Sequence, residues 1–198
     1  MITEEDKQNY QKISKNELNL KFYNACSKGD LEHVKYLLLS PELKENADIH
    51  SYQDEGFIKA CQYGHLDIVK YLMTSPELKE RANIHGQNTR GFMEACAEGH
   101  LDIIEYLLTS SDLKNHAEIY WIDYHALMKA CYYQQPKVID YLVVDYNMNI
   151  SKELEEKLSN TSVSGAGYAR QVIEARDLKN KMTGELEQKI STKLKAKI

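Results

Sequence analysis

The sequence predicts an all-α protein, a solenoid of stacked helix-turn-helix units. A tyrosine recurs every 35 residues, at positions 36, 71, 106 and 141. A period of about 20 to 50 residues is typical of a solenoid, because each unit buries its apolar face against its neighbours. Glycine and proline are scarce, at 9 and 3 residues, which favours helices over a turn-rich β fold. The same 35-residue interval separates the four cysteines, Cys26, Cys61, Cys96 and Cys131.

The elements follow the chain in a simple order. Residues 1–20 are polar and predict an N-terminal capping helix. Residues 21–159 form the repeat domain, residues 160–167 a flexible joint, and residues 168–198 a C-terminal amphipathic helix. The fourth unit is degenerate, as terminal repeats are because one of their faces meets water. The units start near Phe22, Phe57, Phe92 and Leu127.

Each unit is expected to hold two short helices. In the second unit Phe57, Ala60 and Cys61 fall on one face of a first helix, which Gly64 can end in the left-handed conformation. The apolar residues of 68–73 mark a second helix. Small alanine and cysteine side chains suit a seam where helices approach closely.

The apolar stripe of the C-terminal helix has three interpretations that the sequence leaves open. Apolar residues recur at three- and four-residue steps from Val172 to Ile198, with an interruption at Gly184. The stripe could fold back as a cap on the fourth unit, pair with a partner helix, or contact an anionic surface through its lysines.

The charge distribution argues against one large class of function. The net charge of −5 excludes a uniformly basic nucleic-acid-binding protein as a first hypothesis. Residues 1–150 carry 15 basic and 23 acidic side chains, whereas residues 151–198 carry ten basic and seven acidic ones. The solenoid is therefore acidic and the tail mildly basic, which favours a protein partner with a basic patch over nucleic acid.

The chain shows no pattern of membrane insertion or export. It contains no run of about 18 apolar residues, so we expect no membrane-spanning helix. Its opening holds Glu4, Glu5 and Asp6, where a signal peptide carries positive charge. We expect the protein to act in a cytosol, its own or that of a host.

The repeat resembles the ankyrin-repeat family over residues 20–150. Its strongest match is residues 64–72, Gly-His-Leu-Asp-Ile-Val-Lys-Tyr-Leu, which residues 99–107 repeat closely. The Ala-Asp-Ile of residues 47–49 resembles the family's strand entry. The resemblance implies a non-enzymatic protein-interaction module. The Tyr-Leu-rich repeats are similar to those of intracellular bacteria, their phages and large DNA viruses, which often act on host proteins as effectors, adaptors or inhibitors.

Two departures from the family pattern change the surface. The hairpin loops are trimmed by about three residues, and about five are inserted after the second helix. The insertion is Ser-Pro-Glu-Leu-Lys at residues 40–44 and again at residues 75–79. Serine as N-cap with proline next predicts a short extra helical turn.

Motifs for catalysis, metal binding or cofactor binding are absent. The cysteines occupy a core position in every unit and are expected to pack rather than to react. His65 and His100 begin second helices, where the family's histidine commonly makes a local hydrogen bond. The recurring tyrosines are expected to be buried with their hydroxyls in water. We therefore expect no enzyme activity, no metal and no cofactor.

The candidate binding residues are those at which the otherwise constant units disagree. Residues after each Ala-Cys pair are expected on the concave side, and the loops before each first helix vary completely. Aromatic residues gather in the third loop and fourth unit, either as a binding hot spot or as a cover for the end of the core. The candidates are Tyr52, Gln62, Tyr63, Arg90, Glu98, Trp121, Ile122, Tyr124, Tyr132 and Tyr133.

The first hypothesis is a module that binds another protein through its concave face and its aromatic C-terminal half. The alternative is a structural or self-assembling protein that forms homo-oligomers through residues 168–198.

Overall fold

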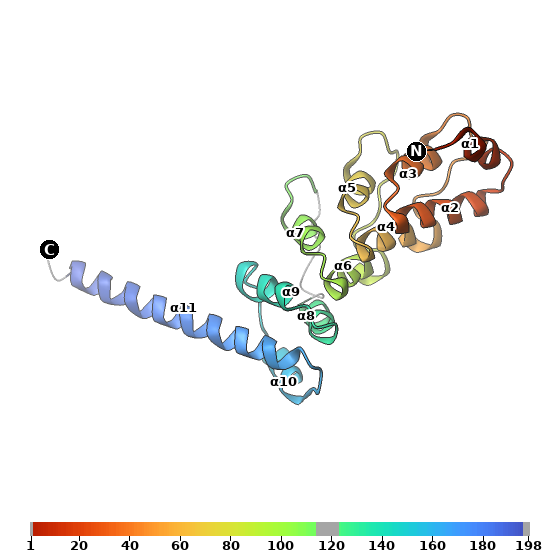
Figure 1. Cartoon of the computed structure of the whole chain (residues 1–198). Helices are drawn as coiled ribbons and strands as arrows, with labels where there is room; N and C mark the ends of the chain where they lie inside the picture. Colours follow the sequence, from red (N-terminus) through yellow and green to blue (C-terminus); the bar gives the residue numbers. More distant parts are fainter. Residues whose placement is uncertain (1, 114–122, 196–198) are drawn as a thin grey trace.

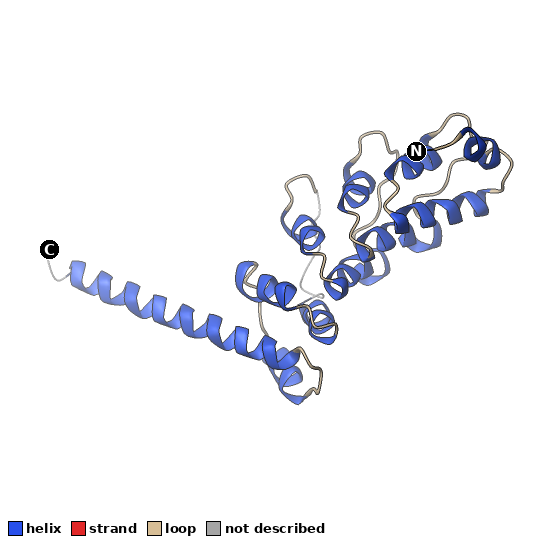
Figure 2. Ribbon diagram, viewed as in Figure 1, coloured by secondary structure: helices blue, strands red, loops and turns tan. Residues whose placement is uncertain are grey.

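The computed structural model describes residues 2–113 and 123–195, and within them it contains helices and no strand (Figure 2). The residues that resemble the family's strand entry, Ala47 to Ile49, form a loop instead. The helices are α1 (Glu4–Tyr10), α2 (Lys15–Lys28), α3 (Leu31–Leu39), α4 (Ser51–Gln62), α5 (Leu66–Thr74), α6 (Gly86–Glu98), α7 (Leu101–Thr109), α8 (Asp123–Tyr132), α9 (Pro136–Asp140), the π-helical turn η2 (Tyr141–Asp145), α10 (Lys152–Asn160) and α11 (Ala166–Lys195).

Four helix pairs, α2–α3, α4–α5, α6–α7 and α8–α9, stack into a solenoid (Figure 1). The first helices, α2, α4, α6 and α8, contact their neighbours far more extensively than the second helices α3, α5 and α7 do. A stack whose one side is packed more closely curves toward that side. The first helices therefore line the inner, concave side of the solenoid.

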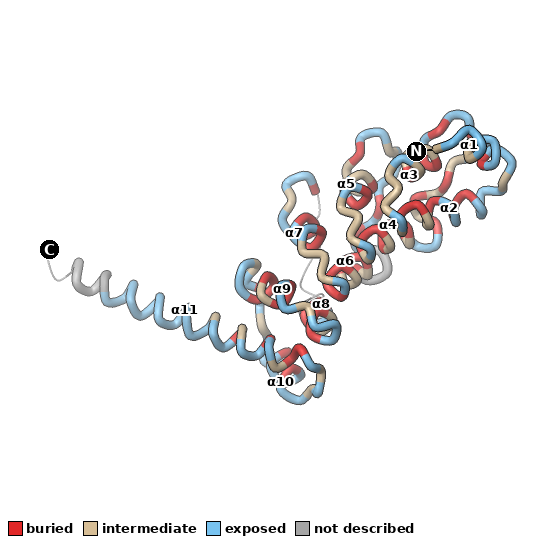
Figure 3. The backbone as a smooth tube through the Cα atoms, in the orientation of Figure 1, coloured by how far each residue is buried: buried red, intermediate tan, exposed pale blue. Residues whose placement is uncertain are grey.

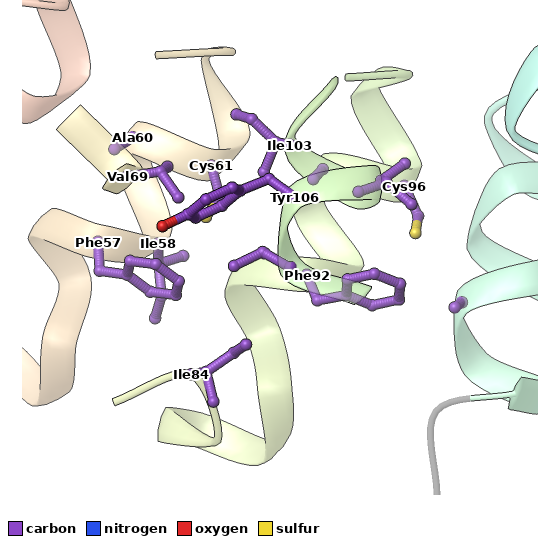
Figure 4. Close-up of a cluster of buried hydrophobic side chains, with 14 of the residues drawn as sticks. Phe57, Ile58, Ala60, Cys61, Val69, Ile84, Phe92, Cys96, Ile103 and Tyr106 are labelled. Carbon is purple, nitrogen blue, oxygen red and sulfur yellow. The ribbon is translucent and has the colours of Figure 1, made fainter. Parts of the chain in front are cut away.

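The core repeats with the sequence. The residues that start the four units, Phe22, Phe57, Phe92 and Leu127, are all buried, as are the four cysteines. Figure 4 shows Phe57 and Phe92 on successive first helices, with Ile103 and Tyr106 of α7 above them. Gly56 permits this spacing, because a Cβ there would lie 2.5 Å from Cε1 of Phe22.

The N-terminal cap is two helices rather than one. Thr3 and Ser14 each form a capping box, with Asp6 and Glu17 respectively, so α1 ends at Tyr10 and α2 begins at Lys15. Tyr10 is buried against the ring of His33 on α3. The segment expected to precede the first unit thus merges into its first helix.

Adjacent units are joined by a repeated hydrogen bond at the start of each second helix. His65 Nε2 lies 3.1 Å from the carbonyl oxygen of Ser27, and His100 Nε2 lies 2.9 Å from that of Gln62. Gln135 replaces histidine in the fourth unit, and its Nε2 donates to Ala97 O at 2.8 Å. The bond expected to be local therefore connects one unit to the previous one.

These bonds depend on glycine at the ends of the first three first helices, α2, α4 and α6. Gly29, Gly64 and Gly99 adopt φ values of 74°, 78° and 83°. A Cβ on Gly64 would also lie 2.6 Å from the ring of His100. Both the left-handed backbone and the close approach require glycine at this position.

Replacing His100 by alanine should destabilise the solenoid, because the carbonyl of Gln62 then lies in a half-buried seam without its donor. The expected loss is about 1–2 kcal/mol in the free energy of unfolding, measured by urea denaturation. His100→Gln is the matched control, since Gln135 already makes the equivalent bond. Equal stability of the alanine and glutamine variants would contradict the role of this bond.

The inserted residues after each second helix form turns, not the helical turn expected from the sequence. The Ser40 hydroxyl accepts the amide of Glu42 at 3.3 Å, and Leu43 N donates to Ser40 O at 3.4 Å. Residues 75–78 repeat both contacts. The serine hydroxyl is used inside the turn, so it does not start a helix.

The loops before the first helices contain left-handed backbone. Tyr52, Gln53 and Asp54, at the start of α4, have φ values of 54°, 61° and 64°. The Asp54 carboxylate binds His50 Nδ1 at 2.8 Å and accepts the amide of Asn83 at 3.3 Å. The Asp54 carboxylate therefore makes one hydrogen bond within the loop and one to the next unit.

The segment expected to be a flexible joint, residues 160–167, packs against the fourth unit. The Gly165 amide donates to Cys131 O at 3.2 Å, and Gly165 and Ala166 are buried. The first turns of α11 continue this contact through Ala169 and Ile173, which are also buried. Figure 3 shows burial at this end of α11 and exposure beyond it.

Candidate protein-binding surface

A ladder of charged side chains runs across the inner side of the solenoid from α4 to α8. Glu55 pairs with Lys59 of the same helix at 3.8 Å and with Arg90 of α6 at 3.2 Å. Glu94 in turn lies 3.7 Å from Arg90 and 3.7 Å from Lys129 of α8. Acidic and basic groups therefore alternate from unit to unit and hold the first helices in register.

Tyrosines extend the ladder at both ends. Lys59 Nζ lies 5.8 Å from the ring centre of Tyr23 and 5.7 Å from that of Tyr63, and Lys129 Nζ lies 5.4 Å from Tyr133. Cation–π contacts of this kind orient both partners. We call this continuous surface the inner strip; it consists of Tyr23, Glu55, Lys59, Tyr63, Arg90, Glu94, Lys129, Tyr132 and Tyr133.

The most apolar part of the inner strip is its C-terminal end. Tyr132 and Tyr133 are 65% and 46% exposed, and their rings meet edge to face with centres 5.1 Å apart. They border a groove of about 440 Å³. Its other lining residues are Met93, His125, Met128, Lys129 and Val163. Exposed aromatic rings beside methionines form an adaptable contact surface.

The structure brings together five of the ten candidates. Tyr63, Arg90, Tyr132 and Tyr133 belong to the inner strip, and the Gln62 side chain joins it by accepting from Lys59 Nζ at 2.7 Å. Glu98 is exposed at the end of α6.

The remaining candidates lie elsewhere. Tyr52, 56% exposed, is at the opposite end of α4 from Tyr63. Trp121 and Ile122 lie outside the described residues, as does the side chain of Tyr124.

The charged ladder itself was missed by sequence reasoning. Its signal is present, since positions 59, 94 and 129 are equivalent in successive units and read Lys, Glu, Lys. Positions 55 and 90 read Glu and Arg in the same way. Alternation of sign between equivalent positions predicts pairing across a stack, because first helices of neighbouring units lie side by side.

The tyrosines repeated every 35 residues lie on the second-helix side. Tyr106 and Tyr141 are buried, and Tyr36 donates to Glu42 at 3.0 Å. The hydroxyl oxygens of Tyr71 and Tyr106 are enclosed, so the expectation that these hydroxyls reach water is wrong for both. Burial raises the pKa of the Tyr71 hydroxyl to about 12.

The four cysteines are buried and unpaired. Burial raises the pKa of every one of these thiols, that of Cys131 to about 12. A thiol reacts with alkylating reagents as its thiolate, and a raised pKa keeps it protonated.

We therefore expect iodoacetamide at about pH 8 to leave all four cysteines unlabelled in the folded chain and to label them all in denaturant. Mass spectrometry of the intact protein measures both. Rapid labelling of Cys131 in the folded chain would contradict its burial.

Two further kinds of feature, metal-binding clusters and membrane-spanning helices, are absent from the part of the chain that the structure describes. No three His, Cys, Asp or Glu side chains there gather as a metal site would require. Among the same residues, no helix is long and apolar enough to cross a membrane.

A family model described as ankyrin repeats (3 copies) matches residues 22–118 and, in a second placement, residues 58–154. Comparison with curated proteins returned no match, and neither did comparison with solved structures.

Proposed function

Because the chain belongs to the ankyrin-repeat family, whose repeats are generally protein–protein interaction modules, we propose that it binds a partner protein through the inner strip. The family is typically non-enzymatic, and we propose the same for this chain. The observation that carries the proposal is the pair of exposed rings, Tyr132 and Tyr133, beside the methionine-lined groove.

The chemistry of the strip indicates what the partner presents. The groove bordered by Tyr132 and Tyr133 suits an apolar or aromatic side chain, because the enclosed rings lose water on contact. Along the ladder, Glu55 and Glu94 are each flanked by two basic groups. A partner with alternating charges matches this part of the strip, and the wider acidic surface of the solenoid favours a partner with a basic patch for its approach.

Binding across the strip would act by occlusion or by scaffolding. The resemblance of the trimmed repeats to those of intracellular bacteria, phages and large DNA viruses supports action on host proteins as an effector, adaptor or inhibitor. Four unpaired cysteines are in keeping with a reducing compartment, the cytosol of the native cell or of its host.

Affinity capture with the immobilised full-length chain, followed by mass spectrometry, tests the proposal. We expect one partner to bind saturably from the native cytosol, and soluble full-length chain to compete for it. The proposal would be contradicted if the soluble chain displaced none of the captured proteins.

A further inference from the structure

The outer part of α11 carries an apolar face that the solenoid leaves uncovered. Leu178, Met182 and Leu186 are 60%, 63% and 59% exposed, and they line an open groove of about 620 Å³ together with Ala175. Figure 1 shows this part of the helix projecting away from the stacked units. Helices of this length gain most of their stability from packing of such a face.

This face points away from the attachment of α11 to the solenoid. The attachment uses Ala166, Ala169 and Ile173, which are buried. Since an α-helix turns about 100° per residue, Ile173 lies on the opposite side of α11 from Met182. The fourth unit therefore cannot cover both faces of one straight helix, and the exposed face is open to another occupant.

We propose that the occupant is a second copy of this chain, whose α11 packs antiparallel with the two Met182 side chains at the centre. In this register Leu178 lies opposite the partner's Leu186, and Ala175 opposite the partner's Lys189, where a small residue leaves room. The two solenoids then attach on the outside of the helix pair, at opposite ends.

Charge complementarity selects the antiparallel arrangement. Glu174, Lys181 and Glu185 lie on one flank of the apolar face, and Lys189 lies within the face on the side of that flank. Antiparallel packing brings this flank against itself. Measured along the helix axis, Glu174 then lies within about 1.5 Å of the partner's Lys189. Lys181 lies within about 3 Å of the partner's Glu185 along the same axis. The two Lys181 residues also come within about 3 Å of each other along the axis, but each has a Glu185 of the partner at the same axial distance. A parallel pair would place Lys181 beside the partner's Lys179, with no glutamate of either flank at that level to offset the two like charges.

Sedimentation velocity of the full-length chain over a range of concentrations tests the proposal. We expect a monomer–dimer equilibrium that Glu174→Lys and Lys189→Glu each weaken by about tenfold. The double variant restores the original charge pairing and should return the dissociation constant to within about threefold of the unmodified chain. These two residues are about 22 Å apart along one helix, so the rescue arises only between chains.

Circular dichroism of each variant checks that the helix remains folded. A monomer at every concentration would overturn the proposal, as would a double variant no better than the single ones. Binding of the monomer to vesicles containing phosphatidylserine, lost on Leu178→Ser, would assign the face to an anionic membrane instead and overturn the second copy.

Discussion

Replacing Tyr132 and Tyr133 together by alanine is expected to reduce affinity for the partner by about a hundredfold or more, so that capture is lost. Both rings are exposed and in contact with each other at the open end of the inner strip. Large aromatic groups in this position supply much of the binding free energy when a partner excludes water from them. Because neither ring belongs to the core, the helix signal and the denaturation midpoint should not change.

A matched control removes exposed apolar groups from the other side of the solenoid. Leu39 ends α3 and is 37% exposed, and Val144 in η2 is 41% exposed. Their double alanine variant should capture the partner as well as the unmodified chain does. Equal capture by both double variants would place the binding surface away from the inner strip.

Replacing Gly165 by valine is expected to lower the free energy of unfolding by about 3 kcal/mol. A Cβ at this position would lie 2.3 Å from the carbonyl oxygen of Cys131 and 2.6 Å from its Cα, and backbone cannot move aside as a side chain can. The clash should separate α10 and the start of α11 from α8. Leu154, Leu158 and Ile173, now buried, would then be exposed.

Urea denaturation followed by circular dichroism measures this loss, together with any change in the slope of the transition. Gly184→Ala is the control, since nothing lies within 4 Å of a Cβ at that position of α11. Alanine there should be neutral or stabilise by up to about 1 kcal/mol, because glycine is a poor residue for a helix interior. An unchanged midpoint for Gly165→Val would contradict the packing of this segment.

The repeat itself could be predicted from the sequence because one physical requirement recurs in every unit. A first helix needs small side chains where it meets its neighbour, and Ala60 and Cys61 provide them. It must also end in left-handed backbone, which Gly64 adopts. These requirements place the same residue types at fixed intervals along the sequence. The structure confirms the predicted all-α solenoid. The prediction of a helical turn at Ser40 was wrong. A serine hydroxyl accepts a backbone amide both at a helix N-cap and inside a tight turn, so the sequence does not distinguish the two.

Contacts between distant segments were harder to predict. Gly165 reads as a flexible residue in the sequence, because nothing near it in the chain indicates that Cys131 O lies against it. The interunit bond of His100 was hidden for the same reason, since its acceptor at Gln62 is 38 residues away. Tyr132 and Tyr133 could be selected from the sequence because the residues at these positions differ between units. The ladder of Glu55, Lys59 and Arg90 could be predicted only by aligning the units and comparing the charges at equivalent positions.

Site-specific photo-crosslinking in the native cytosol tests whether the inner strip is the binding surface. A photoreactive phenylalanine derivative would replace Tyr133 on the strip or, in a second protein, Lys70 on the second-helix side. We expect the first position to give one adduct with the captured partner and the second to give none. An adduct formed from position 70 and absent at position 133 would show that the partner binds the opposite side of the solenoid.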